Sequence, residues 1–349
     1  MSRLTVEQIA DAMRRLTLDQ RNQLLEELQE SSDDRAVGAA PSLDEIREGR
    51  FKDGIYCVYC HDKHLRKVGK QAGRQRYQCV KCSRTFCDVT NTPMYRTRYP
   101  GKWPNYLRCM IQGYSLQESA ELAGISLSTS FEWRHKILHA LTPIASGKFS
   151  GIVEAGETYE LFSAKGCRTL DRGPRHRGGK ATKSGISGEQ VCVLAVRGRD
   201  KTILGRTTGL GRLNSKSLAR VLGSRLPDEG ITLCSDGGTP FITFCRKYKL
   251  RHKKVNLNAG VRISEGIYHI QNVNAVHSRF RNWSRRFNGV ATKYLDNYWA
   301  WFELLDRTKG MKDSERAIRF MLDAMSTVSR VSGKNLSQYH HCHFMELCV

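Results

Sequence analysis

The hydrophobic positions at the start of the chain predict a helical hairpin followed by a linker. Two S/T-x-x-Q boxes, Thr5 with Gln8 and Thr17 with Gln20, each stand ahead of apolar residues at helical spacing. Ser31–Ser42 is rich in Ser, Asp, Gly and Pro, which is typical of a linker. We therefore place the first domain boundary in this segment.

Helical spacing of apolar residues returns between residues 106 and 141. An S-x-x-E box at Ser115 opens one helix, Gly124 marks a turn, and a second helix begins at Ser126 or Ser128. A helix, a short glycine turn and a second polar-faced helix give the outline of a helix-turn-helix. Any helical hairpin has a similar outline, so the pattern favours DNA binding without requiring it.

The second half of the chain has a mixed pattern. Three β-rich runs are followed by a helix at about Ser215–Leu226, another strand, and a long helix from about Asn272 to Asn288. This order predicts an α/β fold with a ribonuclease-H-like mixed sheet and flanking helices, rather than a barrel or a sandwich. The aromatic residues of YLDNYWAWFELL recur at helical spacing, and we expect them in the core against the sheet rather than as base-stacking groups.

Composition adds a partner to this picture. The chain has 349 residues and a formal charge of +23, which favours a polyanion, above all nucleic acid. The first 50 residues hold seven Lys/Arg against eleven Asp/Glu, so this acidic arm is not expected to contact phosphates. We find no run of about 18 apolar residues and no signal sequence. These features predict a cytoplasmic protein without a membrane partner.

Four of the twelve cysteines have the spacing of metal ligands. Cys57-x-x-Cys60 and Cys79-x-x-Cys82 form two knuckles separated by 18 residues among Lys, Arg and Gly. Two such pairs can close a tetrahedral zinc site on a small β-hairpin scaffold. The zinc would be structural, since four thiolates leave no open position for catalysis. The alternative is four buried cysteines with no chemical role.

Basic residues occur in three places where DNA contact is expected. They are the hairpin between the knuckles, the second helix of the predicted helix-turn-helix, and the glycine-rich loop Ser163–Gly185, which holds seven Lys/Arg and one acid. Ordinary solvated surface remains the alternative for the hairpin, and a non-contacting loop for Ser163–Gly185. The candidates are Arg74, Arg76, Arg134, Lys136, Arg175, Arg177, Lys180 and Lys183.

Asp236 is the candidate for binding a catalytic metal. It follows the apolar strand ITLCS and precedes Gly237 and Gly238, which places the carboxylate at the carboxyl end of a strand. Phosphoryl transfer with two Mg²⁺ ions needs carboxylate oxygens converging from neighbouring strand ends and a nearby helix. Asp-Gly is also a common turn pair, so a purely structural role is equally open.

Taken in order, these motifs resemble the zinc-ribbon transposases of bacterial insertion sequences, the ISXO-two-like group of DDE-type enzymes. The resemblance runs from about Leu43 to Leu305. It implies an enzyme that binds terminal inverted repeats, cleaves DNA with Mg²⁺, joins the free 3′ end to target DNA, and acts as a homodimer or larger synaptic assembly near the nucleoid. The motifs are the cysteine ribbon, the helix-turn-helix, VEAGETY, HRGGKATK with EQVCVL, LCSDGG and YHIQNVNAVHSRFRNW.

The resemblance also implies a site and reveals a departure from it. The family's first metal-binding Asp falls at Gly156, its second at Asp236, and its third acidic position at Asn274, with Arg281 as the basic residue on the same helical face. An asparagine oxygen can still ligate a hard cation, whereas glycine has no ligand atom. Glu157 is counted with the site, although successive strand residues point to opposite faces.

Three interpretations follow from Gly156. The chain is a working transposase with an unusual metal site that uses Glu154 or His277, an inactive copy, or a catalytically silent DNA-binding protein that represses transposition. A zinc-ribbon nuclease or regulator with an unrelated target is a further alternative. The predicted domains are an N-terminal arm and linker, a zinc ribbon, a helix-turn-helix, a ribonuclease-H-like domain, and a C-terminal helix and tail, at 1–42, 43–100, 101–147, 148–310 and 311–349.

Overall fold

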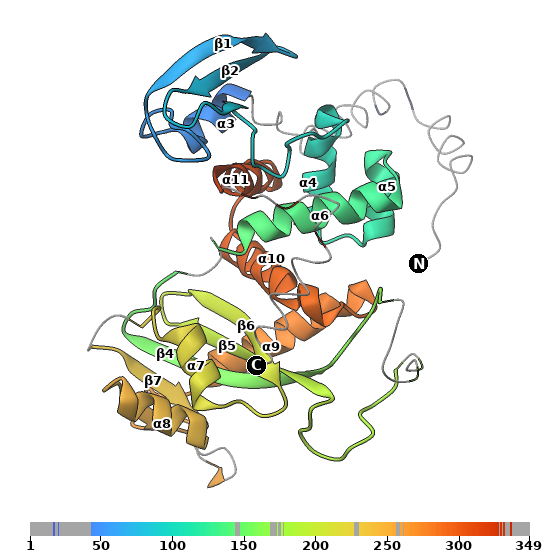
Figure 1. Ribbon diagram of the computed structural model, residues 1–349. Coiled ribbons are helices and arrows are strands. Elements are labelled where there is room, and N and C mark those ends of the chain that lie inside the picture. The colour runs from blue at the N-terminus through green and yellow to red at the C-terminus, as the bar shows by residue number, and fades with distance from the viewer. Residues whose placement is uncertain are drawn as a thin grey trace. The chain divides into compact units, whose positions relative to one another are not determined.

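The computed structural model describes most of the chain from Leu43 onward (Figure 1). The described residues are 17, 20, 43–143, 147–167, 173, 176, 178–226, 230–255, 259–260, 262–327, 329, 331 and 336. The chain divides into two units, Met1–Ala40 and Pro41–Val349. In the first unit, Thr17 and Gln20 form the predicted capping box, because each backbone N–H donates to the other's side chain, at 3.0 and 3.3 Å. The box at Thr5 and Gln8 lies outside the described residues.

The cysteine-rich segment forms a small antiparallel sheet behind one short helix. The strands pair in the order β1-β2-β3, and a tight turn through Gly73, at φ +75°, joins the first two. Its small core packs Phe51, Tyr77 and Phe86 around the cysteines. The elements are α3 (Leu43–Arg50), β1 (Leu65–Gln71), β2 (Arg74–Cys79) and β3 (Thr85–Cys87).

A helical layer follows, and its core draws on distant parts of the sequence. The predicted S-x-x-E box at Ser115 begins one helix, and Gly124, in the left-handed region, ends the same helix. Ser126 caps the start of the following helix. Trp103, Trp133 and Trp301 belong to one buried cluster, which also holds residues of the last helix. The elements are η1 (Pro100–Lys102), α4 (Trp103–Ile111), α5 (Leu116–Ala123), α6 (Leu127–Leu141), α10 (Leu295–Arg307) and α11 (Asp313–Ser326).

The structure corrects the assignment of Arg134 and Lys136 to DNA contact. The Arg134 side chain is 0 % exposed, and its guanidinium donates to the carbonyls of Tyr114 and Ser115 and to the Ser119 hydroxyl. Lys136 is also buried and pairs with Glu132 one helical turn earlier. The sequence pattern missed this burial because α10 and α11 cover α6 from far along the chain.

The second half of the chain builds a five-stranded mixed sheet. Its order is β6-β5-β4-β7-β8. Strand β5 is antiparallel to both β4 and β6, whereas β7 is parallel to β4 and β8 is parallel to β7. The middle strand β4 is therefore bordered by one antiparallel and one parallel neighbour. The strands are β4 (Ile152–Leu161), β5 (Gln190–Gly198), β6 (Ile203–Leu210), β7 (Thr232–Ser235) and β8 (Arg251–Lys254).

Helices cover both faces of this sheet (Figure 1). Phe241 and Phe244 of α8 and Leu218 of α7 pack on one face. Val273 and Phe280 of α9 pack on the other, together with α10. These helices are α7 (Ser215–Leu222), α8 (Thr239–Lys247) and α9 (Gln271–Ser284), and the short turns η3 (Arg285–Phe287) and η4 (Thr292–Tyr294) follow α9.

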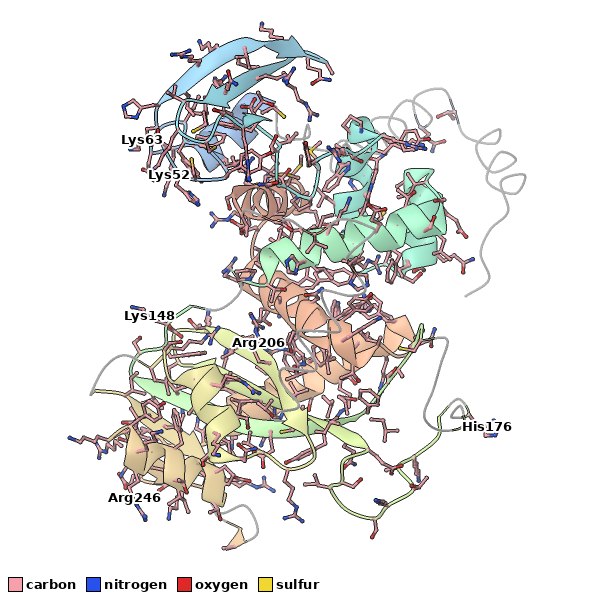
Figure 2. All side chains as sticks on the ribbon, in the orientation of Figure 1. Lys52, Lys63, Lys148, His176, Arg206 and Arg246 are labelled. Atoms are coloured by element: carbon pink, nitrogen blue, oxygen red, sulfur yellow. The ribbon has the colours of Figure 1, made fainter. Side chains whose placement is uncertain are left out.

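Helix α10 closes the edge of the sheet at β6. Trp299 packs against Gly205, where an added methyl carbon would lie 2.0 Å from its ring. The Glu303 carboxylate accepts the Gly205 N–H at 2.7 Å and pairs with Arg206, which Figure 2 labels on β6. The Asp296 carboxylate accepts the Thr207 N–H. The aromatic residues of α10 are thus core residues, as predicted. The carboxylates of α10 accept hydrogen bonds from N–H groups of the edge strand, which are then not available for pairing with a strand of another chain.

Among the described helices, none combines the length and the apolar character needed to cross a membrane.

Candidate functional site

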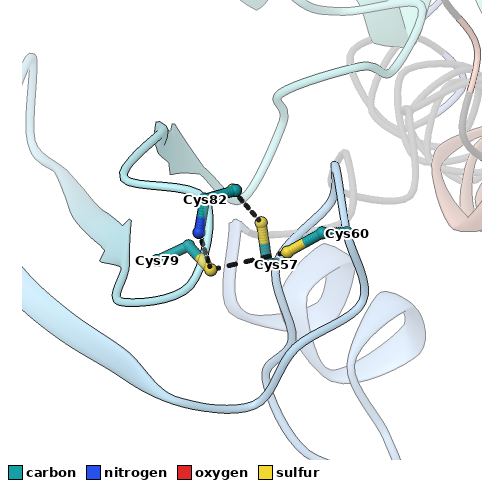
Figure 3. Close-up of side chains that lie close together, drawn as sticks. All are labelled: Cys57, Cys60, Cys79 and Cys82. Carbon is teal, nitrogen blue, oxygen red and sulfur yellow. Dashed lines mark hydrogen bonds between the residues drawn. The ribbon is translucent and has the colours of Figure 1, made fainter.

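The four predicted cysteine ligands converge on one point (Figure 3). Their sulfur atoms all lie within 4.8 Å of one another, and the pairs Cys57–Cys82 and Cys60–Cys79 are each 3.5 Å apart. A tetrahedral Zn²⁺ with Zn–S bonds of about 2.3 Å separates its sulfurs by nearly the same distance. The backbone N–H of Arg84 lowers the pKa of Cys82, whereas burial raises the pKa of Cys57 and the pKa of Cys60 is also raised, so the close spacing of the sulfurs, rather than their acidity, indicates a metal site. The cluster can therefore hold a metal such as zinc.

The basic side chains of this ribbon lie on both strands of the hairpin and in the loops that carry Lys63, Lys81 and Arg84. Arg66, Lys67 and Lys70 on β1 are exposed, whereas Arg74 and Arg76 on β2 are half-buried, and Arg76 contacts the Thr85 hydroxyl. Both strands of the hairpin have basic sequences, and β2 is covered because β3 pairs with its other edge. Arg74 and Arg76, the two residues selected from the sequence, are therefore less exposed than the basic residues of β1.

Asp236 and Gly156 lie at the same level on adjacent strands. The parallel pairing of β4 with β7 places Glu154 opposite Cys234, and each of the two site positions stands two residues further on. Asp236 is exposed, and its Oδ1 accepts the Gly238 N–H at 3.0 Å in the turn before α8. One carboxylate oxygen thus stabilises the turn, and the other faces solvent beside the strand end.

Gly156 faces helix α9. A methyl group added at Gly156 would lie 3.4 Å from Cε1 of His277 and 3.6 Å from Cγ1 of Val273, which are ordinary contact distances. The position therefore has room for a β-carbon, and packing against α9 does not require glycine there.

Glu154 is the buried anchor of α9. Its side chain is 0 % exposed, and its Oε2 accepts the backbone N–H groups of Asn272 and Val273 at 2.8 and 3.1 Å. Its Oε1 accepts the Asn272 side-chain amide at 2.7 Å and pairs with Arg199 at 3.3 Å. Ile270 at the N-cap has no side chain that can accept a hydrogen bond, so the strand supplies the cap. Glu154 is fully engaged and cannot replace the carboxylate missing at Gly156.

Glu157 points to the opposite face of β4. It pairs in register with Leu194, which belongs to the core under α7 and α8, whereas Gly156 pairs with Ala195 in the core under α9. Burial raises the pKa of Glu157, and the negative charge of Asp236 raises it further. Its Oε2 is buried and accepts no hydrogen bond from the described residues. Glu157 is therefore close enough to Asp236 to sense its charge, but its side chain lies on the face of β4 opposite to position 156.

Helix α9 carries three polar residues along the candidate site. Asn274 is exposed and follows Val273, whose Cγ1 would lie 3.6 Å from a β-carbon at position 156. Burial lowers the pKa of His277 to about 4, the Arg281 charge acts in the same direction, and a hydrogen bond to the Gly156 carbonyl opposes both. Arg281 donates to the Thr158 hydroxyl at 3.1 Å. The helix therefore brings one neutral imidazole and one guanidinium to β4, whereas the Asn274 side chain is exposed.

These residues do not fit a two-metal carboxylate site. Two Mg²⁺ ions need several anionic oxygens, and among the described residues Asp236 is the one carboxylate on a neighbouring strand end at the level of Gly156. Glu160 shares the face of Gly156 but stands four residues further along β4, where burial raises its pKa and the Arg281 charge opposes that rise. Glu154 is held by α9, and Glu157 lies on the other face. Magnesium chemistry therefore lacks its central ligand here.

The basic loop is described in part. Lys180 and Lys183 are exposed, and the Glu189 carboxylate accepts the backbone N–H groups of Thr182 and Lys183. Arg175 and Arg177 lie outside the described residues. The two lysines thus extend from a segment whose backbone is tied to the start of β5.

Comparisons with known proteins point to mobile DNA. No family model matches the chain. The chain is 26% identical over 286 residues to an uncharacterised protein in transposable element ISH50 of Halobacterium salinarum, a match that covers 78% of this chain and 92% of that protein. The two are distant homologues. A crystal structure of a pre-cleavage Mos1 transpososome matches 61% of this chain and 77% of its own chain, at 8% identity and a TM-score of 0.20.

We expect one zinc ion per chain, lost when a knuckle is broken. Cys57→Ser should abolish stoichiometric zinc in purified protein measured by atomic absorption, because a structural site needs all four thiolates. Cys167→Ser, which removes an exposed cysteine outside the cluster, is the matched control and should keep the zinc. Full zinc content in both variants would contradict the site.

Two glutamates on β4 should respond in opposite ways to loss of charge. Glu154→Gln should destabilise the fold by about 3 kcal/mol in urea unfolding, because it breaks a buried, hydrogen-bonded ion pair. Glu157→Gln should be neutral or stabilising at pH 7, since the Glu157 carboxylate is half-buried with an unpaired oxygen. Equal losses in the two variants would exclude the special role of Glu154.

His277 should make the fold less stable in mild acid. The unfolded chain takes up its proton near pH 6.5, and the folded chain only near pH 4, so stability falls as the pH drops through this window. Urea unfolding at a series of pH values should show a shallower decline for His277→Gln than for the wild type. The exposed His176→Gln is the control and should follow the wild-type profile.

Proposed function

We propose that this chain is a transposase-derived DNA-binding protein of an insertion element whose strand-cleavage site is incomplete. The observation that carries the proposal is Gly156 beside Asp236, with room for a β-carbon, while Glu154 on the same face is held by α9 and Glu160 stands four residues further along the strand. The distant homology to a protein of a transposable element supports the mobile-element origin.

The sheet order supports the finer assignment of a ribonuclease-H-like domain. Three antiparallel strands, a crossover helix, and two strands parallel to the first place β4 at the centre, with Asp236 at the neighbouring strand end. In open α/β sheets, ligands bind beyond the carboxyl ends of the strands where the strand order reverses. Phosphodiester chemistry in a DDE-type enzyme would use this edge.

The other segments supply DNA-binding parts. The cysteine ribbon has an exposed row of cations on β1, and α5 with α6 forms the helix-turn-helix, whose exposed residues Ser126 to Ser128 lie at the start of α6. In this motif the N-terminal residues of the second helix read base edges. We propose that these two parts bind the element's terminal inverted repeats, and that the chain pairs two DNA ends as a dimer or larger assembly.

Active strand transfer is the second candidate, and His277 is the observation that favours it. Its ring faces Gly156, its low pKa keeps it neutral near pH 7, and its Nε2 is buried with no hydrogen-bond partner among the described residues. A neutral imidazole nitrogen can ligate a transition metal such as Mn²⁺ better than it ligates Mg²⁺. This candidate requires cleavage by the unmodified chain.

Restoring a carboxylate should restore strand cleavage. Gly156→Asp should cut end-bearing DNA with Mg²⁺ or Mn²⁺ at a rate on the order of 10² or more above the wild type in single-turnover assays, because it returns the central metal ligand. The β-carbon that the substitution adds meets α9 at 3.4 and 3.6 Å, so we expect a folded protein, which circular dichroism of the variant checks.

Gly156→Asn is the matched control, since it fills the same space without the charge and should remain as inactive as the wild type. All three proteins should bind the same DNA with equal affinity. Equal cleavage by the wild type and by Gly156→Asp would show that the natural site works, and would favour the second candidate.

A further inference from the structure

Two hollows adjoin between the sheet and the helix-turn-helix. The first, of about 640 Å³, lies between the end of β4 and the C-terminal part of α9. The second, of about 660 Å³, lies between the N-terminal parts of α5 and α6 and residues 286–298. Lys165, Gly166 and residues 288–290 line both hollows, so the two are parts of one trough. Neither Asp236 nor Gly156 lines the trough, which shares Arg281 with the incomplete site and extends from there toward α5 and α6.

The trough is strongly basic. Lys165, Arg281 and Arg285 line it with exposed side chains, and Glu160 is the one carboxylate among its lining residues. The Lys165 ammonium donates to the Gly289 carbonyl at 3.0 Å, which holds it where the two hollows meet. The Arg285 side chain makes no hydrogen bond or ion pair with the part of the chain that the structure describes. Unpaired cations in a concave surface attract an anion.

The second hollow has an aromatic and apolar wall. Phe131 of α6 contacts the Tyr294 ring at 5.8 Å between centroids, and both line the hollow. Leu127 lies on the same wall and is 55 % exposed, so it adds apolar surface that is open to a ligand. Aromatic walls beside a row of cations are the combination that binds sugar–phosphate chains and bases. An acidic protein segment would use the cations but gain little from stacking.

We propose that this trough holds one strand of the bound DNA between the helix-turn-helix and α9. The phosphates follow Lys165, Arg285 and Arg281, and sugars or bases of the same strand lie against Phe131. This inference rests on the proposed function, because it names the surface through which the chain holds its DNA. It also explains why α6 can be buried along most of its length and still present its N-terminal end to DNA.

Paired charge removal tests the trough. Full-length protein is titrated into two fluorescent duplexes, one with the repeat that flanks the gene and one of unrelated sequence, at several KCl concentrations. Each phosphate contact adds about 0.9 to the slope of log affinity against log salt. Lys165→Ala with Arg285→Ala should therefore lower the slope by about 1.8 on both duplexes. Arg246→Ala with Lys247→Ala removes equal charge from α8 on the opposite face and should leave the slope unchanged (Figure 2).

The outcomes separate this inference from the proposed function. If the wild type binds DNA and the trough variant keeps the wild-type slope, the trough is not on the DNA path, and the proposed function stands. If the wild type binds neither duplex, both fail. A photoreactive phenylalanine at Phe131 gives an independent result. Cross-links to DNA support the trough, whereas cross-links to a second copy of the chain would overturn it in favour of a protein interface.

Discussion

The geometry of the candidate site depends on one buried carboxylate. Glu154 joins the central strand to α9 by capping the helix N-terminus, where unpaired N–H groups and the helix dipole both favour a negative charge. A buried charge is tolerated only when donors surround it, and Asn272 and Arg199 complete that set. The cap fixes the helix along β4, so that His277 faces Gly156. Glu154 shares the face of Gly156 on β4, but its carboxylate is held in this cap and is not available as a metal ligand.

The same kind of contact recurs at the β6 edge of the sheet. Glu303 and Asp296 of α10 accept backbone N–H groups of β6. These N–H groups lie at the edge of the sheet, where no further strand is present to pair with them. Burial raises the pKa of Glu303 to about 7, and Arg206 opposes that rise. Helices α9 and α10 are thus attached to the sheet by polar contacts as well as by apolar packing. Because α10 also enters the core of the helical layer that holds α4 and α6, it links that layer to the sheet in one compact unit.

Much of the architecture could be read from local pattern. Cysteine spacing predicted a cluster that the structure assembles, and the capping signals at Ser115 and Ser126 start helices where expected. The strand–helix order of the second half also emerges, because alternation and turn residues act over short distances. The roles of charged residues were harder to predict. The sequence pattern around Arg134 predicts an exposed residue that contacts DNA. In the structure Arg134 is buried, because helices from the end of the chain cover α6.

The sequence by itself determined the composition of the site: a glycine at position 156, an aspartate after β7, and four cysteines at ligand spacing. These are local facts, since a residue type fixes which ligand atoms exist. Only the tertiary structure decided which acids are available, because burial and hydrogen bonding depend on elements far apart in sequence. Folding commits Glu154 to a helix 118 residues away, turns Glu157 to the other face, and leaves Asp236 without a partner carboxylate at the level of Gly156.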